Sequence, residues 1–568
     1  MTAPAAPRTR LWLAVALALT ALKLWLTRGQ GVAAFGGAGH DDRLYVEFAQ
    51  HLLRGGWLGP YNELTLAQGP FYPLFIAGTF ILGLPLFFAQ HLFYAAACAL
   101  FVQALGPALA SAGARLFIYA LLLWNPMTFD SSTMGRVIRE HVYGPLGLMI
   151  FAGLIALYLR RAEPARRQIP WVLLLGLAGG AFYLTREDAA WIAPGGLLLA
   201  GAYLHASGKI SRVAARRAAG WLGLTLVVAA LPVLYVCARN KQIYDWFGTC
   251  EHRSADFRAA YGAMLRVRVG PELPLVPVTR EAREAMAAAS PLFAEVQRQF
   301  DAGVALRWAR AAEAITHLPP AQGQIGGQWF GRAIRDAVAR AGYYGNAVQS
   351  RFFYRKLARE LNQACDSGRL PARPGRNGFL PPWRADRTGP FLHAARDLAD
   401  FVVSFSRFSA RTPVSEGSPE ELQLFRNLTH ERLAAPVGEL DPVGAAQYRL
   451  NTWKAGVLHE TGKALRPVLL GLFILAQVVV LLRVGQAAWR REWTYPLTVA
   501  AAAWVAGVTA VLMLAMTQAT SGPVHTIASF APVYPLVLAF IGVALADAAT
   551  AWIKPRPATA NPAGGGSV

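Results

Sequence analysis

Residues 11–26 read LWLAVALALTALKLWL and follow closely on Arg8 and Arg10. An apolar run of this kind approaches the roughly 20 residues that a helix needs to cross the hydrocarbon core of a bilayer. A cleaved signal peptide has the same order of charged and apolar residues, but no convincing cleavage site follows this run. We therefore expect an uncleaved signal anchor whose N-terminus stays inside the cell.

The whole chain shares this apolar character. Its 568 residues are 54% hydrophobic and 15% charged, with a mean hydropathy of +0.32. Soluble domains are less apolar and carry about 25% charged residues. The net charge is +22, and the Arg and Lys residues cluster between apolar runs. This pattern indicates contact with an anionic cytoplasmic leaflet, and no basic aromatic groove or motif indicates nucleic-acid binding.

Further apolar runs cover 71–88, 91–110, 113–125, 141–159, 170–184, 190–206, 219–237, 467–483, 495–516 and 526–547. Several are short, so we expect tilted or bent spans. Basic clusters at 160–167, 209–217, 483–491 and 554–556 should be cytoplasmic by the positive-inside rule. The segments 28–70, 126–140, 185–189 and 238–466 then lie outside. The Ala- and Arg-rich composition suggests a bacterial plasma (inner) membrane, with these loops facing the periplasm or exterior.

The run 71–88 is predicted to be re-entrant or to lie at the membrane interface. Three apolar runs separate the loops 28–70 and 126–140, although two loops on the same side need an even number of crossings between them. Gly83 and Pro85 interrupt the first of these runs, and non-helical turns at membrane depth are tolerated against protein or water. The prediction is an all-α polytopic membrane protein with about 10–11 transmembrane segments.

The long polar segment 238–466 is predicted to be one extracytoplasmic soluble domain, inserted between the seventh span and the last three. The remaining parts are a transmembrane module over 1–237, C-terminal transmembrane helices over 467–550 and a disordered cytoplasmic tail over 551–568.

Helix signals in the sequence predict that the inserted domain is mainly helical. The stretch 418–421 reads SPEE and is typical of a capped helix start, and near-helical apolar spacing after Asn346 predicts a second helix. Cys250 and Cys365 both fall in this domain. A disulfide between them and two unpaired thiols are both compatible with the sequence.

The first outer loop carries an acidic pair. Residues 39–53 read GHDDRLYVEFAQHLL, and their apolar spacing predicts a helix along the membrane surface. Asp41 and Asp42 at its start could simply favour the positive end of the helix dipole. A partly desolvated carboxylate beside an arginine is also suited to general-base catalysis. The loop ends at 68–73, QGPFYP, where the chain turns back into the membrane.

Two later outer loops are also charged. Arg136 and Arg139, one turn apart and beside Glu140, could hold a phosphate or form an internal ion pair that caps the next span. The turn at 185–188, TRED, lies between two short apolar runs. Charges at such depth are usually functional or paired, although a plain exposed hairpin is the alternative. Residues 517–525, between the last two apolar runs, form a further outer loop. Its one candidate residue is His525, although a lone histidine in a loop usually has no function.

The order of these motifs resembles the GT-C superfamily of membrane glycosyltransferases. An acidic pair with a tyrosine is followed by a proline–aromatic re-entry, by Asn125-Pro126 at the end of a span, by Arg139-Glu140 and by the Thr-Arg-acidic turn. Within this superfamily, the sequence resembles the protein O-mannosyltransferases and the lipid A aminoarabinose transferases. The resemblance covers about residues 1–240, and the segment 238–466 occupies the place of the variable outer loop.

Those families have a motif resembling Asp-Glu-x-Arg-Tyr, whose first residue is the catalytic base. Asp41, Asp42 and Tyr45 match its first, second and last positions. Arg43 lies one place early, and Leu44 stands where the arginine belongs.

The re-entry is similar to the family's Lys-Pro-Pro-Leu-Tyr stretch. Pro70, Tyr72 and Pro73 match it in kind, and Gln68 replaces the basic residue.

The resemblance implies an inverting transfer of a sugar from a polyprenyl-phosphate donor to a hydroxyl of a lipid, glycan or protein acceptor. Asp41, beside Asp42, would be the catalytic base, and Arg43, Arg139 and Arg186 would stabilise the departing phosphate. The other expected substrate contacts are His40, Tyr45, Gln68, Tyr72, Glu140, Glu187, Asp188 and His525. No cofactor is expected, and a divalent metal at Asp41 and Asp42 is the less favoured alternative.

Two other classes of protein remain compatible with the pattern. A transporter would also use intramembrane charges and a broken segment, but paired half-repeats are not evident and the charges gather on one face of the membrane. A non-catalytic relative could use its outer domain to bind a partner. Asp41→Asn should abolish transfer in an enzyme and need not affect transport or binding.

Overall fold

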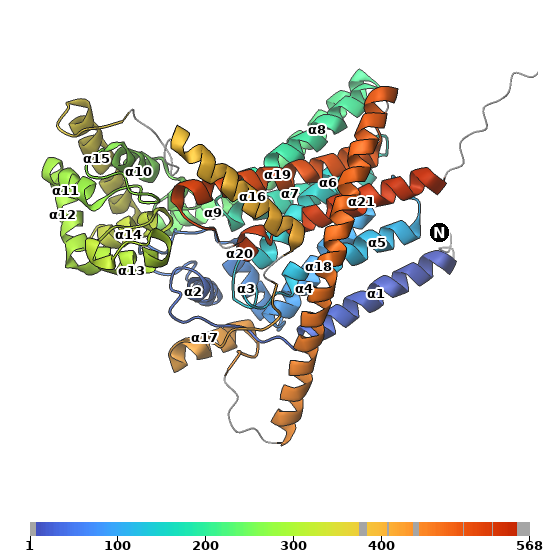
Figure 1. Ribbon diagram of the computed structural model, residues 1–568, viewed down its shortest axis with the longest axis horizontal. Coiled ribbons are helices and arrows are strands. Elements are labelled where there is room, and N and C mark those ends of the chain that lie inside the picture. Colours follow the sequence, from blue (N-terminus) through green and yellow to red (C-terminus); the bar gives the residue numbers. More distant parts are fainter. Residues whose placement is uncertain are drawn as a thin grey trace, which may run out of the picture.

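The computed structural model describes residues 7–373, 383–405, 408–435, 442–491, 493–524 and 526–553. Within these ranges the regular elements are helices, and β pairing is limited to isolated bridges. Eight helical stretches are long and apolar enough to cross a membrane. The protein is therefore an all-helical, multi-pass membrane protein, as predicted (Figure 1).

These eight stretches are α1 (Pro7–Thr27), α4 (Leu86–Ala104), α6 (Glu140–Leu159), α7 (Ala165–Thr185), α8 (Ala193–Gly208) with the turn before it, α9 (Arg212–Tyr244), α18 (Pro442–Arg490) and α19 (Tyr495–Ser521). Three further apolar helices are α3 (Phe71–Ile81), α5 (Ala112–Leu123) and α21 (Tyr534–Ile553). Together they occupy the same parts of the chain as the predicted apolar runs.

The helix α3 is too short to span a bilayer. Its 11 residues rise about 16 Å, roughly half of the hydrocarbon thickness. Predicting one segment over 71–88 was wrong in extent, because Gly83 adopts a φ of 65° and α4 already begins at Leu86, directly after Pro85. The predicted single span at 526–547 is likewise two helices, α20 (Thr526–Phe530) and α21.

The helix α6 lies at the centre of the membrane-spanning part, against α4, α7 and α8. Small residues allow close approach between these apolar helices. A Cβ on Gly153 of α6 would lie 2.7 Å from the Cβ of Leu175 in α7, and one on Gly176 would lie 2.5 Å from the Cβ of Val228 in α9. At these glycines, the backbone of one helix therefore contacts a side chain of the next, from α6 to α7 and from α7 to α9. This close packing fixes the loops at the ends of the helices.

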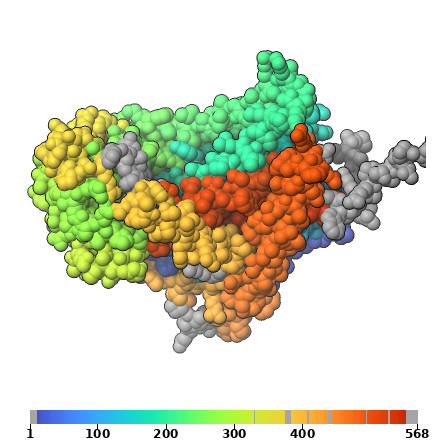
Figure 2. All heavy atoms as spheres, turned by 45° about the horizontal axis from the view of Figure 1, so that its top comes forward, coloured from blue at the N-terminus to red at the C-terminus, as the bar shows by residue number. Residues whose placement is uncertain are grey.

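Six helices after α9 form a separate unit, which we call the outer unit. They are α10 (Ala255–Arg266), α11 (Arg280–Ala289), α12 (Pro291–Gln299), α13 (Ala305–Thr316), α14 (Gly327–Arg340) and α15 (Ala347–Asp366). They bury a core of their own, from Phe257 to Leu370. Figures 1 and 2 show this unit gathered at one end of the molecule.

The two helices that follow the outer unit pack elsewhere. The helix α16 (Thr388–Ser404) lies against α19 and α20, and α17 (Pro419–Thr429) lies against α2 (Asp42–Leu53) and α3. The predicted domain limits at 238 and 466 both fall inside continuous helices, α9 and α18. Most of the predicted tail, 554–568, lies outside the described residues.

The structure confirms the two predicted helix starts at Ser418 and Asn346. Ser418 and Glu421 form the predicted capping box of α17. Asn346 caps α15 by accepting a hydrogen bond from the amide of Gln349. Cys250 and Cys365, like the other two cysteines, are buried free thiols.

The four segments predicted to lie outside meet at one end of the apolar helices, which we call the loop end. Val32 bridges to Leu433, Ala33 to Arg136, and Phe35 to Glu416. The amide of Gly69 donates to Glu187 over 3.0 Å. Segments far apart in the sequence therefore build one surface.

Candidate functional site

The helix α2 holds the acidic pair at the loop end. Leu44 and Phe48, on its predicted apolar face, are buried in a cluster with Trp57. Asp41 occupies the N-cap position, but its side chain accepts no capping hydrogen bond from the helix. The carboxylate of Asp41 therefore still lies at the positive end of the helix dipole, but it is available for contacts with other residues.

The carboxylate of Asp41 remains partly open to solvent. It accepts hydrogen bonds from Gln68 at 3.4 Å and from Arg332 at 3.2 Å, and its side chain is 41% exposed. Desolvation would raise the pKa of Asp41, but the positive charges of Arg332, Arg139 and Arg136 hold it below the ordinary value. Asp41 is thus an accessible, ionised carboxylate.

Asp42 has a different environment. Its side chain is 0% exposed, and its two oxygens accept from Arg136 at 3.0 and 2.5 Å. Burial raises the pKa of Asp42 to about 6, against the opposing effect of Arg136. These contacts make Asp42 an anchor of the second outer loop.

The acidic pair does not fit a divalent metal. Both oxygens of Asp42 are engaged by a guanidinium, and Asp41 already contacts Arg332. In the part of the chain that the structure describes, no group of three or more His, Cys, Asp or Glu residues could hold a metal ion. A metal at this place would have to displace two arginines.

Gln68 links the segment before α3 to the acidic pair. It donates to the carbonyl oxygen of His40 over 2.6 Å, and its side-chain oxygen accepts from the hydroxyl of Tyr45. Tyr72 is fully buried, accepts a hydrogen bond from Gln90 and packs edge-on against Tyr45. The two tyrosines therefore position Gln68, and Gln68 in turn positions Asp41.

Gly69 permits the contact between the first and third outer loops. A Cβ at this position would lie 2.0 Å from the carbonyl oxygen of Leu184. The close approach lets the amide of Gly69 reach Glu187. No other residue type would fit there without moving one of the loops.

Two of the three predicted phosphate-binding arginines each pair with two carboxylates. Arg43 pairs with Glu47 and Glu421. Arg186 pairs with Glu140 at 2.8 Å and with Asp188 at 2.7 Å. For Glu140, the internal ion pair proposed as the alternative therefore exists, but its partner is Arg186.

Arg139 remains at the site. It donates to Glu187 at 3.0 Å and to the carbonyl oxygen of Thr185 at 3.1 Å. Its side chain also lines a small pocket beside Asp41, of about 190 Å³. The polar residues around this pocket are His40, Glu63, Gln68, Arg139, Glu187, His252, Arg332 and Arg335.

Arg335 contributes a buried cation with unused donor capacity. Its side chain is 4% exposed and pairs with Glu251 at 2.8 Å. Its Nη2 has no hydrogen-bond partner among the described residues. An unsatisfied buried guanidinium N–H costs free energy, so the pocket favours an anionic ligand.

His40 forms one wall of the pocket. Its ring packs against Trp308 at 5.2 Å between ring centroids. Desolvation, followed by the charge of Arg332, lowers the pKa of His40 to about 4. At neutral pH its ring is therefore uncharged and can both donate and accept a hydrogen bond.

The structure brings five of the predicted residues together at the pocket and adds others. His40, Gln68, Arg139 and Glu187 line the pocket, and Asp41 lies at its edge. His525 lies outside the described residues. Sequence reasoning missed Arg332 and Arg335, whose only signal is their three-residue spacing on one face of α14.

No known protein family matches the sequence, and no curated protein matches it. The structure is similar to two solved structures of ArnT from Cupriavidus metallidurans, one bound to undecaprenyl phosphate and one in the apo state. The first similarity covers 96% of this chain and 79% of that chain at 15% identity, with a TM-score of 0.31. The second covers 94% and 76%, also at 15% identity and a TM-score of 0.31.

Proposed function

We propose that this protein is an integral-membrane glycosyltransferase that moves a sugar from a polyprenyl-phosphate donor to an acceptor hydroxyl. The observation that carries the proposal is the ionised, partly exposed carboxylate of Asp41 at the edge of a pocket lined by Arg139, Arg332 and Arg335. A base and an anion site adjoin each other at the end of the apolar helices. That combination suits displacement of a phosphate leaving group by a hydroxyl.

Asp41 is the proposed general base. It accepts the proton of the acceptor hydroxyl as the oxygen attacks the anomeric carbon, with inversion, while the bond to the phosphate oxygen breaks. General-base catalysis by a positioned carboxylate typically accelerates a reaction by about 10²–10⁴-fold. An anionic donor bound among the same arginines would offset their effect on Asp41, so its pKa would rise and the carboxylate would become a stronger base.

The pocket arginines are the proposed phosphate ligands. Preorganised cations aimed at a developing anion stabilise the transition state without reorganisation. The free Nη2 of Arg335 can donate to a phosphate oxygen at no loss of an existing contact. Arg332 and Arg335 thus take the roles that the sequence suggested for Arg43 and Arg186, and Arg139 keeps its predicted role.

The proposed orientation follows from the charges at the far ends of the helices. Arg160 and Arg161 directly follow α6, and Arg490 ends α18. The positive-inside rule assigns such ends to the cytoplasm. The loop end and its pocket would then face the periplasm or exterior of a bacterial plasma membrane.

The experiment that tests this function is an incorporation assay with the full chain in lipid. Radiolabelled polyprenyl-phosphate sugars are supplied as a panel, with host membranes as the acceptor. The parent should transfer one of them, and Asp41→Asn should be at least about 100-fold slower. Asp400→Asn, an exposed carboxylate on α16, serves as the matched control and should keep full activity.

Three outcomes would count against the proposal. Equal activity of the parent and Asp41→Asn would remove Asp41 as the base. Inhibition by EDTA would restore the metal alternative. No transfer across the whole panel would favour a transporter or a non-catalytic relative.

A further inference from the structure

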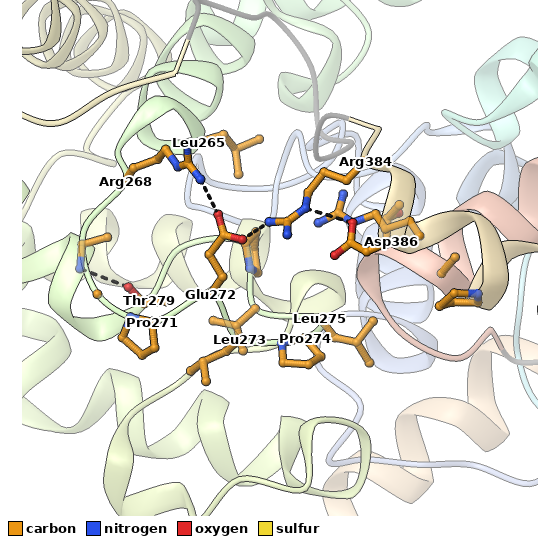
Figure 3. Close-up of a pocket in the computed structure, with 18 of the residues that line it drawn as sticks. Leu265, Arg268, Pro271, Glu272, Leu273, Pro274, Leu275, Thr279, Arg384 and Asp386 are labelled. Atoms are coloured by element: carbon orange, nitrogen blue, oxygen red, sulfur yellow. Dashed lines mark hydrogen bonds and ion pairs between the residues drawn. The ribbon is translucent and has the colours of Figure 1, made fainter.

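A second cavity lies between the outer unit and the membrane-spanning helices. Its volume is about 670 Å³, and its lining residues do not overlap with those of the pocket beside Asp41. Its walls come from the loop between α10 and α11, from Arg373, from residues 384–387 and the start of α16, and from the last turn of α19. Figure 3 labels residues of the loop between α10 and α11 and of the segment just before α16. None of the residues discussed so far as part of the Asp41 site takes part in it.

Arginines dominate the charge of this cavity. Glu272 accepts from Arg268 at 2.9 Å and from Arg373 at 2.6 Å, and it also pairs with Arg384. Figure 3 shows the carboxylate of Glu272 between the guanidinium groups of Arg268 and Arg384. One carboxylate cannot neutralise three guanidiniums, so the cluster keeps excess positive charge.

Two further charged residues, one basic and one acidic, do not change the excess positive charge of the cavity. Arg387 also lines the cavity, and Asp386 pairs with Arg384 at 3.0 Å. Desolvation, and then the positive charge of Arg268, lower the pKa of Arg373. The cavity would therefore gain stability from a bound anion.

The depth of the cavity indicates where such an anion would come from. Gln518, Ala519 and Thr520, at the loop end of the candidate span α19, form part of its wall. An apolar span ends where the hydrocarbon core gives way to lipid headgroups. The cavity therefore lies near the level of the headgroups of the adjacent leaflet.

Apolar side chains next to the cavity also favour a position near the lipid headgroups. Leu273 and Leu275 line it, and Leu392 of α16 is an exposed large apolar residue. The exposed Trp383 packs edge-on against Phe391. Exposed aromatic residues are enriched where membrane meets water, so charge and apolar surface occur together here.

We propose that this cavity binds the phosphate-bearing headgroup of an anionic lipid, through Arg268, Arg373 and Arg384. A phosphate oxygen pair matches the planar fork of a guanidinium and would share these arginines with Glu272. The lipid's first carbons would lie against the apolar loop at Leu273. This site is independent of the Asp41 pocket and does not require the proposed transfer reaction.

The test uses the full chain in detergent micelles, with retained lipids counted by native mass spectrometry. The probes are phosphatidylglycerol, undecaprenyl phosphate, zwitterionic phosphatidylcholine and inorganic phosphate. The parent should retain anionic lipid in preference to phosphatidylcholine. The triple variant Arg268→Gln, Arg373→Gln, Arg384→Gln should bind phosphatidylglycerol at least about tenfold more weakly.

A matched control removes the same charge elsewhere on the outer unit. Arg298, Arg310 and Arg359 are exposed and line neither the cavity nor the Asp41 pocket. Their triple change to Gln should leave lipid retention unchanged. If the control loses as much lipid as the cavity variant, net charge alone explains retention and the proposal fails.

A second variant keeps every arginine and so protects the test against misfolding. Gln518→Glu adds a carboxylate to the cavity wall with almost no change in shape, and it should weaken retention of anionic lipid by repulsion. Unchanged retention in both Gln518→Glu and the cavity triple variant would overturn the proposal.

The probes also distinguish the sources of the phosphate. Retention of both anionic lipids supports a general headgroup site, and retention of undecaprenyl phosphate alone assigns the site to the polyprenyl lipid. Arg332→Gln, which affects only the Asp41 pocket, separates the contribution of that pocket. If inorganic phosphate at equal concentration competes as well as the lipids do, the cavity is a plain anion site and the lipid proposal is overturned.

Discussion

The guanidinium of Arg332 on α14 donates to the carboxylate of Asp41 over 3.2 Å, although 291 positions separate the two residues. Asp41 belongs to the first outer loop, and Arg332 belongs to the outer unit. The outer unit thus supplies side chains to the candidate site and does not merely cover it. Two of the three guanidiniums of the pocket come from α14.

Arg332→Gln should slow transfer by about 10–100-fold, because a cation near the departing phosphate is lost. Arg332 also lowers the pKa of Asp41, so the acid limb of the pH–rate profile should move to higher pH. Both effects are measured from kcat/KM across the acidic and neutral range. Arg310→Gln, an exposed arginine on α13, is the control, and an unmoved acid limb would contradict the assignment.

Arg186→Gln should destabilise the protein by about 1–3 kcal/mol. The substitution leaves Glu140 and Asp188 without their ion-pair partner. Breaking a fully buried ion pair costs more, but water still reaches these two carboxylates and lowers the cost. The double variant Arg186→Gln, Glu140→Gln should recover most of that stability and keep transfer within a few-fold of the parent. Thermal unfolding and the transfer assay check this, and a stable but inactive double variant would make Arg186 a phosphate ligand after all.

Asp42 should make the protein less stable as the pH rises from about 4 to 6. Its pKa is raised from 3.8 to about 6, so the folded state binds the proton more tightly than the unfolded chain does. The resulting stabilisation, about 2–3 kcal/mol for a buried carboxyl, is present below the ordinary pKa and is lost as the pH passes about 6. His40 titrates in the opposite sense over this range, so the quantity to measure is the difference in unfolding temperature between the parent and Asp42→Asn. That difference should fall with rising pH; a rise would refute the assignment.

Gly69→Ala should be strongly destabilising, because the new Cβ would lie 2.0 Å from the carbonyl oxygen of Leu184. The loops would have to separate, and the hydrogen bond from Gly69 to Glu187 would break. Gly37→Ala in the same outer loop meets no atom within 4 Å and should be nearly neutral. Yield and unfolding temperature of the two variants should differ clearly, and similar behaviour would show that the loops are not held this tightly.

The membrane class and the acidic pair could be predicted because both are local in the sequence. Apolar runs give the spans, and the periodicity of residues 44–52 gives α2. Asp41 stands out because two acidic residues begin a helix at a membrane boundary. The capping box at Ser418 could be predicted for the same reason, since all its parts lie within four residues.

The partners of these residues could not be predicted, because they depend on tertiary packing. Nothing near Arg186 distinguishes a phosphate ligand from a residue already paired with Glu140 and Asp188. Nothing near Arg332 indicates that α14 turns this face towards a loop almost 300 positions earlier. The domain limits could not be predicted either. The apolar composition changes near residues 238 and 466, but α9 and α18 continue through these points without a break.

The separation of Asp41 from Arg332 also sets an order of events during synthesis. Ribosomes add about 5–20 residues per second, so Arg332 follows Asp41 after about 15–60 s. Until then the site is incomplete. Asp41 and Arg139 are present, but Arg332 and Arg335, the other two arginines of the pocket, have not yet been synthesised. A nascent chain therefore acquires its anion pocket only when the outer unit has folded, well after its carboxylate has reached the membrane surface.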